Sequence, residues 1–246
     1  MKINWLYIKG VLLLGLVVFL VGFSNQRNST LKVTDVIIEF EKGNNLFMNY
    51  QIVNKLLIQN GKTVRNKEKS VIDLQKLEAN ILAHPMVEDA TVFLTINGEL
   101  RAKVRQRTPV ARVVLSSGSY YIDRQGERMP LSELHTERVL IISGEIAPKD
   151  LKKIHLLVTE IRNDYFLNEM IIDIQKMEDG TYNLRTRIGD QIIIFGKIEE
   201  IKHKLKNLNS FFNKALRDGS IGNYSLINLN YKNQVICTKV EEYGTE

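Results

Sequence analysis

Hydrophobic and polar residues alternate over two neighbouring stretches in the first half of the chain. The first stretch runs from Val87 to Ile96, and the second runs from Leu100 to Val104. Asn97-Gly98 separates them, and this dipeptide is typical of a tight turn between antiparallel strands. The pattern therefore predicts one antiparallel ribbon with a single buried face. Its apolar members are Val87, Ala90, Val92, Leu94, Ile96, Leu100, Ala102 and Val104.

The residues before this ribbon have apolar positions spaced as on one face of an α-helix. Ser70 and Asp73 form a capping-box pattern ahead of an apolar stripe. A second helix fits Asn49 to Asn60, with Gly61 as its C-terminal stop. A strand from Val33 to Phe40 comes before both helices. The predicted order is strand, helix, helix, strand, strand, and about seventy residues suffice for such a domain to bury a core.

The second half of the chain, from about Pro109, mixes strand and helix signals. Two amphipathic helices are predicted, one after Pro148 and one from Ile198 to Leu216. A turn from Lys232 to Gln234 separates the last two strands. The expected fold class is α+β, with a mainly antiparallel β domain and two helices. The strands are expected at 110–115, 120–123, 139–143, 170–177, 182–188, 191–195 and, as a final pair, within 224–239.

An apolar run near the N-terminus predicts a single transmembrane helix. The run from Val11 to Phe23 carries no charge, but thirteen helical residues reach only about 20 Å. We therefore extend the span to Trp5, with Trp5 and Tyr7 at the interface and Lys9 reaching toward the headgroups. This orientation places the N-terminus in the cytoplasm and the bulk of the chain outside the inner membrane. The alternative is a cleaved secretory signal, although no small-x-small cleavage site follows the run.

Charge and cysteine content change this picture little. The net charge is +6 and Cys237 is the single cysteine, so no intramolecular disulfide forms. Without an aromatic-rich RNA motif beside them, the basic residues do not predict nucleic-acid binding. Attraction to anionic headgroups or acidic wall polymers is a weaker alternative. Four lysines are assigned to the solvated face of the last helix, namely Lys202, Lys204, Lys206 and Lys214.

The sequence carries no recognisable catalytic motif. Phe195-Gly196-Lys197 lacks the upstream glycine of a P-loop and fits the end of a strand better. The histidines do not have ligand spacing, so neither a metal nor another cofactor is expected. Carboxylates that converge in space would still permit a membrane-tethered wall enzyme. The residues considered are His84, His135, His155 and His203, and the acidic Asp173, Glu178, Asp179, Glu199 and Glu200.

Both predicted domains end in strands. A terminal strand leaves main-chain N–H and C=O groups unpaired, and a partner strand can add to such an edge. The sequence thus favours protein binding over catalysis, and we expect no enzyme.

Several segments resemble a known family. The segment from His84 to Val92, the basic strand after it, and the segment from Arg107 to Val113 resemble the junction between the POTRA and β domains of the bacterial division protein family FtsQ, called DivIB in Gram-positive species. The segment from Tyr120 to Ser132 resembles the first hairpin of that β domain. Met86 departs from the family, in which an aromatic residue is common, and the cytoplasmic tail is almost absent. The resemblance implies a noncatalytic divisome scaffold that binds FtsB- and FtsL-like partners and helps recruit and regulate septal peptidoglycan synthesis.

The resemblance also implies where these partners bind. In the family, a tyrosine before the final turn and the strand after it form the partner-binding region. Asn230 replaces the arginine that the family has beside this tyrosine. Packing of alternate side chains into the core is the competing interpretation. The positions implied here are Tyr231, Asn233, Val235, Cys237 and Lys239.

The resemblance divides the chain into six parts. Other divisome proteins are expected to dock on the POTRA-like domain. An outer-membrane assembly factor is a rival assignment, but it needs a long barrel that about 130 residues do not supply. The parts are a cytoplasmic tail (1–4), the anchor (5–23), a linker (24–32), the POTRA-like βααββ domain (33–107), the FtsQ-type β domain (108–240) and a frayed tail (241–246).

Overall fold

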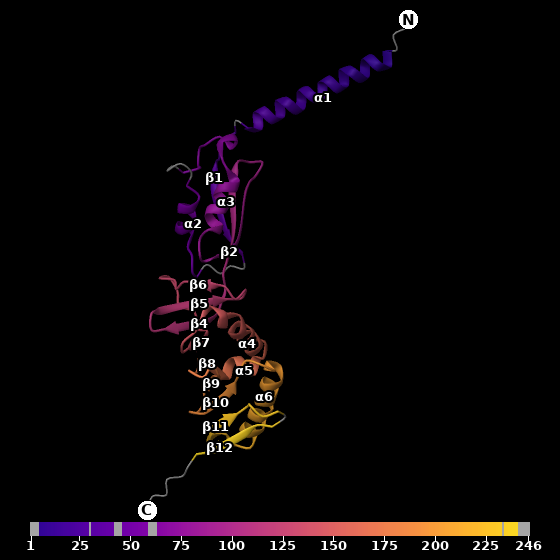
Figure 1. Ribbon diagram of the computed structural model, residues 1–246. Helices are drawn as coiled ribbons and strands as arrows, with labels where there is room; N and C mark the ends of the chain where they lie inside the picture. The colour runs from indigo at the N-terminus through magenta and orange to yellow at the C-terminus, as the bar shows by residue number, and fades with distance from the viewer. Residues whose placement is uncertain (1–4, 30, 42–45, 59–62, 233, 241–246) are drawn as a thin grey trace, which may run out of the picture. The chain divides into compact units, whose positions relative to one another are not determined.

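The computed structural model describes residues 5–29, 31–41, 46–58, 63–232 and 234–240, without the side chains of 6–8 and 25–29. The chain divides into two compact units, Met1–Gln106 and Arg107–Glu246 (Figure 1). Each unit has its own sheet.

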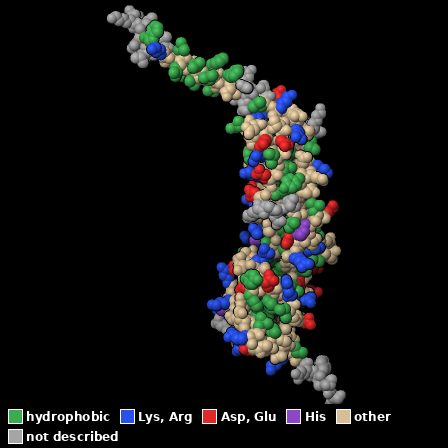
Figure 2. Space-filling view, turned by 180° about the vertical axis from the view of Figure 1, so that it is seen from behind, with side chains coloured by type: hydrophobic (Ala, Val, Ile, Leu, Met, Phe, Trp, Pro, Cys, Tyr) green, Lys and Arg blue, Asp and Glu red, His purple; other side chains and the backbone are tan. Residues whose placement is uncertain are grey.

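Helix α1 (Trp5–Ser29) opens the first unit. Its large apolar side chains between Val11 and Phe23 are exposed, and Figure 2 shows hydrophobic side chains along it. Lys9 Nζ lies 6.0 Å from the centre of the Trp5 ring, whereas the side chain of Tyr7 lies outside the described residues. Over the described residues, no helix has the combined length and apolarity that a membrane crossing requires. The transmembrane part of the fold prediction is therefore not confirmed.

The rest of the first unit has the predicted order of strand, helix, helix, strand, strand. The sheet order is β1-β3-β2, with β1 parallel to β3 and β2 antiparallel to it. Buried side chains of α3 and β3 form its core, including Leu77, Ile81, Leu100, Ala102 and Val104. The elements are β1 (Asp35–Phe40), α2 (Tyr50–Leu56), the 3-10 turn η2 (Lys69–Val71), α3 (Leu74–Leu82), β2 (Val87–Leu94) and β3 (Glu99–Gln106).

The ends of these elements differ from the prediction in several places, and β1 begins at Asp35 instead of Val33. Ser70 lies in η2, and Asp73 alone caps α3 by accepting from Lys76 N at 2.9 Å. Helix α2 ends at Leu56, while the predicted stop at Gly61 lies outside the described residues. The prediction that Ile96 belongs to the buried face was wrong, because Ile96 sits in the turn and is 89% exposed.

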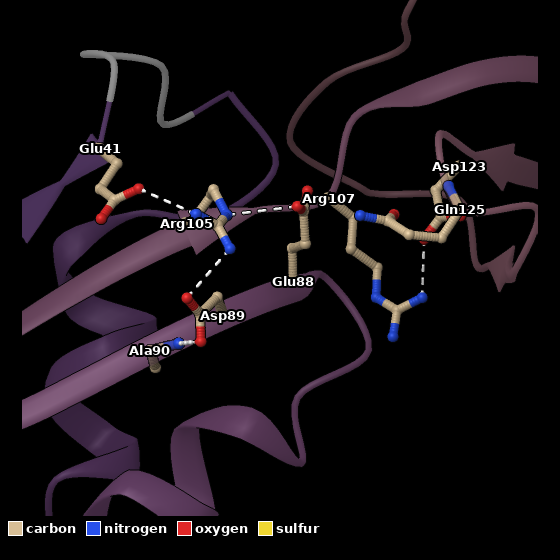
Figure 3. A network of polar contacts seen from close by, with 8 residues as sticks. All are labelled: Glu41, Glu88, Asp89, Ala90, Arg105, Arg107, Asp123 and Gln125. Carbon is tan, nitrogen blue, oxygen red and sulfur yellow. Dashed lines mark hydrogen bonds and ion pairs between the residues drawn. The ribbon is translucent and has the colours of Figure 1, made fainter.

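Arg105 joins the three acidic residues nearest to it in the first unit. Its guanidinium lies 3.0 Å from Asp89, 3.2 Å from Glu88 and 3.5 Å from Glu41 (Figure 3). This cluster connects β2 and β3 with the end of β1, and thereby ties the three strands together at one end of the sheet.

The second unit is a nine-stranded mixed sheet with the order β12-β11-β10-β9-β8-β7-β4-β5-β6. Its strands are β4 (Pro109–Leu115), β5 (Gly118–Asp123), β6 (Arg128–Met129), β7 (Leu140–Ser143), β8 (Ile171–Lys176), β9 (Tyr182–Thr186), β10 (Ile192–Gly196), β11 (Tyr224–Asn228) and β12 (Ile236–Lys239). The pairs β4–β7, β7–β8 and β10–β11 are parallel and the other five are antiparallel, so the sheet is mainly antiparallel.

Helices cover one face of this sheet (Figure 1). The helical elements are η3 (Pro148–Asp150), α4 (Leu151–Asn163), α5 (Tyr165–Met170), α6 (Ile201–Arg217) and η4 (Ile221–Asn223). The prediction of two helices missed α5, whose last residue was assigned to the following strand. Helix α6 begins three residues later than predicted, because Glu200 before it has a left-handed φ of +50°.

One ion pair joins β8 to η3, at the start of the helical connection between the parallel strands β7 and β8. Lys176 Nζ on β8 lies 2.8 Å from Asp150 Oδ2 in η3 and donates at 2.9 Å to Glu145 O. Asp150 also accepts a hydrogen bond from Ala147 N at 3.0 Å. The hydrogen bond from Lys176 holds the pKa of Asp150 below its usual value of 3.8.

We predict that this pair stabilises the fold in a pH-dependent way. The pKa of Asp150 is lower in the folded state than in the unfolded state. The stabilisation by Asp150 is therefore complete above its unfolded-state pKa, and it is lost as pH falls through its folded-state pKa. Asp150→Asn should therefore lower the melting temperature at pH 7, and this difference from wild type should shrink below about pH 4. Melting curves across this range test the prediction, with Asp190→Asn in an exposed loop as the control. A difference that persists at low pH would contradict it.

Candidate functional site at the terminal strands

The sheet of the second unit ends in β12, which has one neighbour. β12 pairs antiparallel with β11, and no described strand lies on its other side. The edge at the opposite end of the sheet, β6, is only two residues long. β12 is therefore the longer of the two open edges, and a terminal edge offers main-chain groups to another strand.

The register of β12 determines which side chains face the core. Ile227 pairs with Cys237 and Asn228 with Ile236, and the register shifts between Tyr224 and Leu226. Ser225 Oγ lies within 3.4 Å of the carbonyl oxygens of Thr238 and Lys239 at this irregularity. Val240 N still donates to Asn223 O at 2.9 Å, so the pairing continues to the end of the strand.

The five positions implied by the sequence occupy different environments. Val235 and Cys237 are half-buried and pack against the core, as the competing interpretation expected. Tyr231 is 48% exposed in the loop before β12, and Lys239 is exposed at the end of the strand. Asn233 lies outside the described residues. The structure thus divides the set into inward and outward positions, and partner contact at each of them stays a prediction.

The outward face of β12 contains residues that the sequence analysis did not select. Ile236 is 42% exposed and alternates with the inward Val235 and Cys237. Ile192 on β10 is also exposed on this face, in line with Leu226 of β11, whereas the neighbour of Ile236 on β11 is the polar Asn228. Strand alternation in the sequence could have identified Ile236, but it did not indicate which face the core occupies.

The loop that leads into β12 packs against the end of β10. Leu229 N donates to Ile194 O at 2.9 Å, and Asn230 N donates to Asn228 Oδ1 at 2.9 Å. Gly196 has a φ of +74°, and a side chain there would collide with the side chain of Asn230. Asn230, which departs from the family pattern, therefore has a packing role at this site.

A shallow hollow of about 560 Å³ adjoins the loop. Lys232 lines it together with residues from the start of α6 and one acidic side chain of α4. Its charge is mixed, so it does not select an anion or a cation. The lining includes Glu160, Glu199, Glu200, Lys202 and His203.

The pKa shifts at the site follow from burial. Burial raises the pKa of the Cys237 thiol, which favours its neutral form. Lys204 is not purely solvated, contrary to the prediction, because its Nζ donates to Phe195 O at 2.8 Å and Lys197 O at 2.9 Å. Burial accordingly lowers the pKa of Lys204. This lysine joins α6 to the end of β10.

Among the carboxylates considered for catalysis, the two with shifted pKa values, Asp173 and Asp179, do not line one hollow. Burial raises the pKa of Asp173 on β8, where it accepts a hydrogen bond from Ser143 Oγ at 3.2 Å. Hydrogen bonds from Thr181 lower the pKa of Asp179. A hollow of about 900 Å³ is lined by Glu178 and Asp179, and Asp173 is not among its lining residues. The two carboxyls with shifted pKa values therefore do not share this hollow. Glycosidase chemistry would require two such carboxyls to face the same cleft.

Comparisons with known proteins agree with this architecture. Residues 32–105 match a family described as POTRA-like domain. Residues 108–238 match a family described as FtsQ/DivIB, C-terminal related. The two matches correspond to the first unit beyond α1 and to the second unit.

Two curated relatives are both called cell division protein FtsQ. The protein from Salinibacter ruber is 25% identical over 174 residues, covering 63% of this chain and 66% of the relative. The protein from Rhodothermus marinus is 25% identical over 188 residues, covering 71% of this chain and 68% of the relative. The matches thus span about two thirds of each relative. Because the second family match alone extends over more than half of the chain, the chain belongs to the FtsQ/DivIB family.

Proposed function

We propose that this protein is a noncatalytic, membrane-anchored divisome scaffold. Its C-terminal strand region binds FtsB- and FtsL-like division proteins, and through them it helps to recruit and regulate septal peptidoglycan synthesis. The observation that carries the proposal is the open edge of β12 at the end of the nine-stranded sheet. Membership of a division-protein family supports the same assignment.

The mechanism of binding is β-augmentation. A partner strand pairs with the main chain of β12 and extends the sheet by one strand. Ile236 supplies exposed apolar surface beside that strand, while Val235 and Cys237 hold β12 on the core. Tyr231 and Lys239 stand at the two ends of the edge and contact the partner there. Main-chain pairing does not depend on the arginine that Asn230 replaces.

Helix α1 supplies the membrane anchor in this proposal. The segment from Val11 to Phe23 contains no charged residue, and its large apolar side chains are exposed. Such a surface is unfavourable in water and is stabilised by lipid. Trp5 and Tyr7 then occupy the interface, and Lys9 extends toward the headgroups. The bulk of the chain lies outside the inner membrane at the division site.

The decisive experiment replaces one exposed isoleucine at a time. Ile236→Asp places a charge on the outward face of β12, and Ile141→Asp places it on β7 in the middle of the same open face. The side chains of Ile236 and Ile141 are 42% and 43% exposed, so the two substitutions are made at positions with nearly the same exposure to solvent. Full-length variants are expressed in cells and recovered from native membranes, and FtsB- and FtsL-like proteins are quantified in the recovered material.

We expect Ile236→Asp to reduce recovery of both partners at least about tenfold, because a charge is desolvated when a strand packs beside it. Ile141→Asp should leave recovery unchanged. Circular dichroism of each variant verifies the fold. Equal recovery with both variants would move the partner-binding surface away from β12 and overturn the proposal.

A further inference from the structure

The turn between β2 and β3 carries an apolar side chain that the core does not use. Ile96 is 89% exposed, which makes it the most exposed large apolar side chain among the described residues. Its neighbours in the turn are Thr95 and Asn97-Gly98. Single exposed apolar side chains are ordinary on protein surfaces, so the surroundings of Ile96 decide whether it belongs to a binding surface.

Two more exposed apolar side chains lie at the same end of the domain. Leu31 is 44% exposed and Val71 is 59% exposed. Lys69 joins both to the turn, because its main-chain N donates to Leu31 O at 2.9 Å and its Nζ donates to Thr95 O and Ile96 O at 3.0 Å. Val71 ends the 3-10 turn η2 that Lys69 begins. Leu31, Val71 and Ile96 therefore surround Lys69, and we call these three side chains the apolar tip.

Main-chain pairing holds the chain at this end of the domain. Lys32 forms an antiparallel bridge with Glu68, and Val33 N donates to Lys67 O at 2.8 Å. On the other side, Thr34 N donates to Gly98 O at 2.9 Å in the β2–β3 turn. The segment that leads into β1 is thus fixed between η2 and the β2–β3 turn.

This end of the domain is positively charged. Residues 24–35 contain two basic residues and one acidic residue, and residues 61–73 contain four basic residues and two acidic ones. Their combined charge of +3 is half of the net +6 of the chain, although they make up 25 of its 246 residues. This count already includes Asp35, which lies 3.5 Å from Arg65. A positive field therefore surrounds the apolar tip.

The same end of the domain receives the chain from the apolar run of α1. Helix α1 ends at Ser29, six residues after Phe23, and Leu31 follows two residues later. Leu31 therefore lies within about 16 Å of the end of the apolar run, because six helical residues advance about 9 Å and two more add at most about 7 Å. A helix that crosses the membrane at a tilt brings Leu31 still nearer to the lipid.

The combination of apolar and basic groups indicates the occupant of this surface. Attachment to a membrane surface strengthens with the apolar area that enters the interface and with the attraction of basic residues to anionic lipids. A second copy of the chain would bring two positive ends together, and their charges would repel. An anionic lipid surface satisfies both the apolar tip and the charge around it.

We propose that the apolar tip of the POTRA-like domain binds the headgroup layer of an anionic membrane, beside the point where α1 leaves it. Ile96 and Val71 enter the layer between the lipids, and Lys32 lies at the level of the phosphates. The contact gives the domain a fixed orientation on the membrane. This inference rests on the proposed function, because it requires α1 to be a membrane anchor, and it adds lipid as a ligand of the domain itself.

Tryptophan fluorescence of the full-length protein in phospholipid vesicles tests the contact. Trp5 is the single tryptophan, so Trp5→Phe provides a background in which Ile96→Trp reports on the tip. Leu82→Trp is the matched control, because Leu82 is 43% exposed at the opposite end of β2. The eight residues of β2 separate the two positions by about 26 Å. Lipids brominated near the headgroup end of their acyl chains quench a tryptophan that enters the interface.

In vesicles of mixed phosphatidylcholine and phosphatidylglycerol, we expect the brominated lipid to lower the emission of Ile96→Trp at least about twofold and to leave Leu82→Trp nearly unchanged. Vesicles of phosphatidylcholine alone, or high salt, should weaken the quenching, because the attraction to phosphatidylglycerol is removed or screened. Lys32→Gln should weaken it too. Lys103→Gln, at an exposed position in the middle of β3, is the control and should not. Circular dichroism verifies the fold of each variant.

Trp5 of the wild-type protein tests the anchor separately. Quenching of Trp5 without quenching in Ile96→Trp would overturn this inference and leave the anchor in place. Absence of quenching at Trp5 would overturn the anchor and, with it, this contact. Equal quenching in Ile96→Trp and Leu82→Trp, or in the neutral and anionic vesicles, would also overturn the inference. Self-association in detergent that Ile96→Asp abolishes, measured by sedimentation, would overturn it by assigning the apolar tip to a second copy.

Discussion

Asp123→Ala is expected to lower the free energy of unfolding of the β domain by about 3–5 kcal/mol. The Asp123 side chain is 1% exposed, and its Oδ2 lies 2.8 Å from Arg107 Nη1 (Figure 3). Its other oxygen accepts hydrogen bonds from Gln125 N at 2.9 Å and Glu127 N at 2.8 Å. Alanine would remove all three interactions and leave the part-buried donors without this acceptor.

These contacts hold two parts of the domain together. The backbone bonds shape the turn between β5 and β6, where Gly126 has a φ of +86°. The ion pair with Arg107 fixes the first residue of the second unit, and Arg124 N donates to Thr108 O at 3.1 Å beside it. Loss of the carboxylate should therefore loosen both the start of β4 and the β5–β6 turn.

Chemical denaturation of the full-length protein in detergent measures the effect. Asp190→Ala, at an exposed loop position, is the matched control and should change the unfolding free energy by less than about 0.5 kcal/mol. Asp123→Asn retains an acceptor for the two backbone donors but not the charge, so its loss should fall between those of the other two variants. A loss for Asp123→Ala as small as that of the control would contradict the assignment of this carboxylate as a structural anchor.

The regular helices and strands could be predicted because burial follows the backbone period. In α4 the residues Ile154, Leu157, Val158 and Ile161 are all buried, as their spacing requires. Helix α5 was missed because its six residues are too few to show a period and run directly into β8. Asp164, which caps it by accepting from Leu167 N at 3.0 Å, was the signal available in the sequence.

Interactions between distant segments could not be predicted. The burial of Asp123 depends on Arg107, sixteen positions away, and the sequence does not show that these two meet. At β12, alternation predicts that Val235 and Cys237 share one face, but only the register with β11 assigns that face to the core. The parallel pairing of β10 with β11 likewise follows from the packing of α6 and not from any local pattern.

Phe212→Ala should destabilise the β domain by about 3–5 kcal/mol through the cavity that it creates. Phe212 is fully buried on α6, where its ring centre lies 6.0 Å from that of Phe166 and 5.8 Å from that of Phe211. Helix α6 connects β10 with β11, and β11 carries β12. Weaker packing of α6 is therefore expected to lower the local stability of β11 and β12, the strands that present the proposed partner-binding edge.

Denaturation and hydrogen exchange together test this connection. Phe211→Ala is the matched control, because Phe211 is the same residue type on the same helix but only partly buried, 5.5 Å from the Tyr224 ring. It should cost less stability than Phe212→Ala. Amides of β11 and β12 should exchange faster in Phe212→Ala than in Phe211→Ala, because the structural opening that exposes them becomes less costly. Equal exchange in both variants would show that the edge strands are held independently of the α6 core.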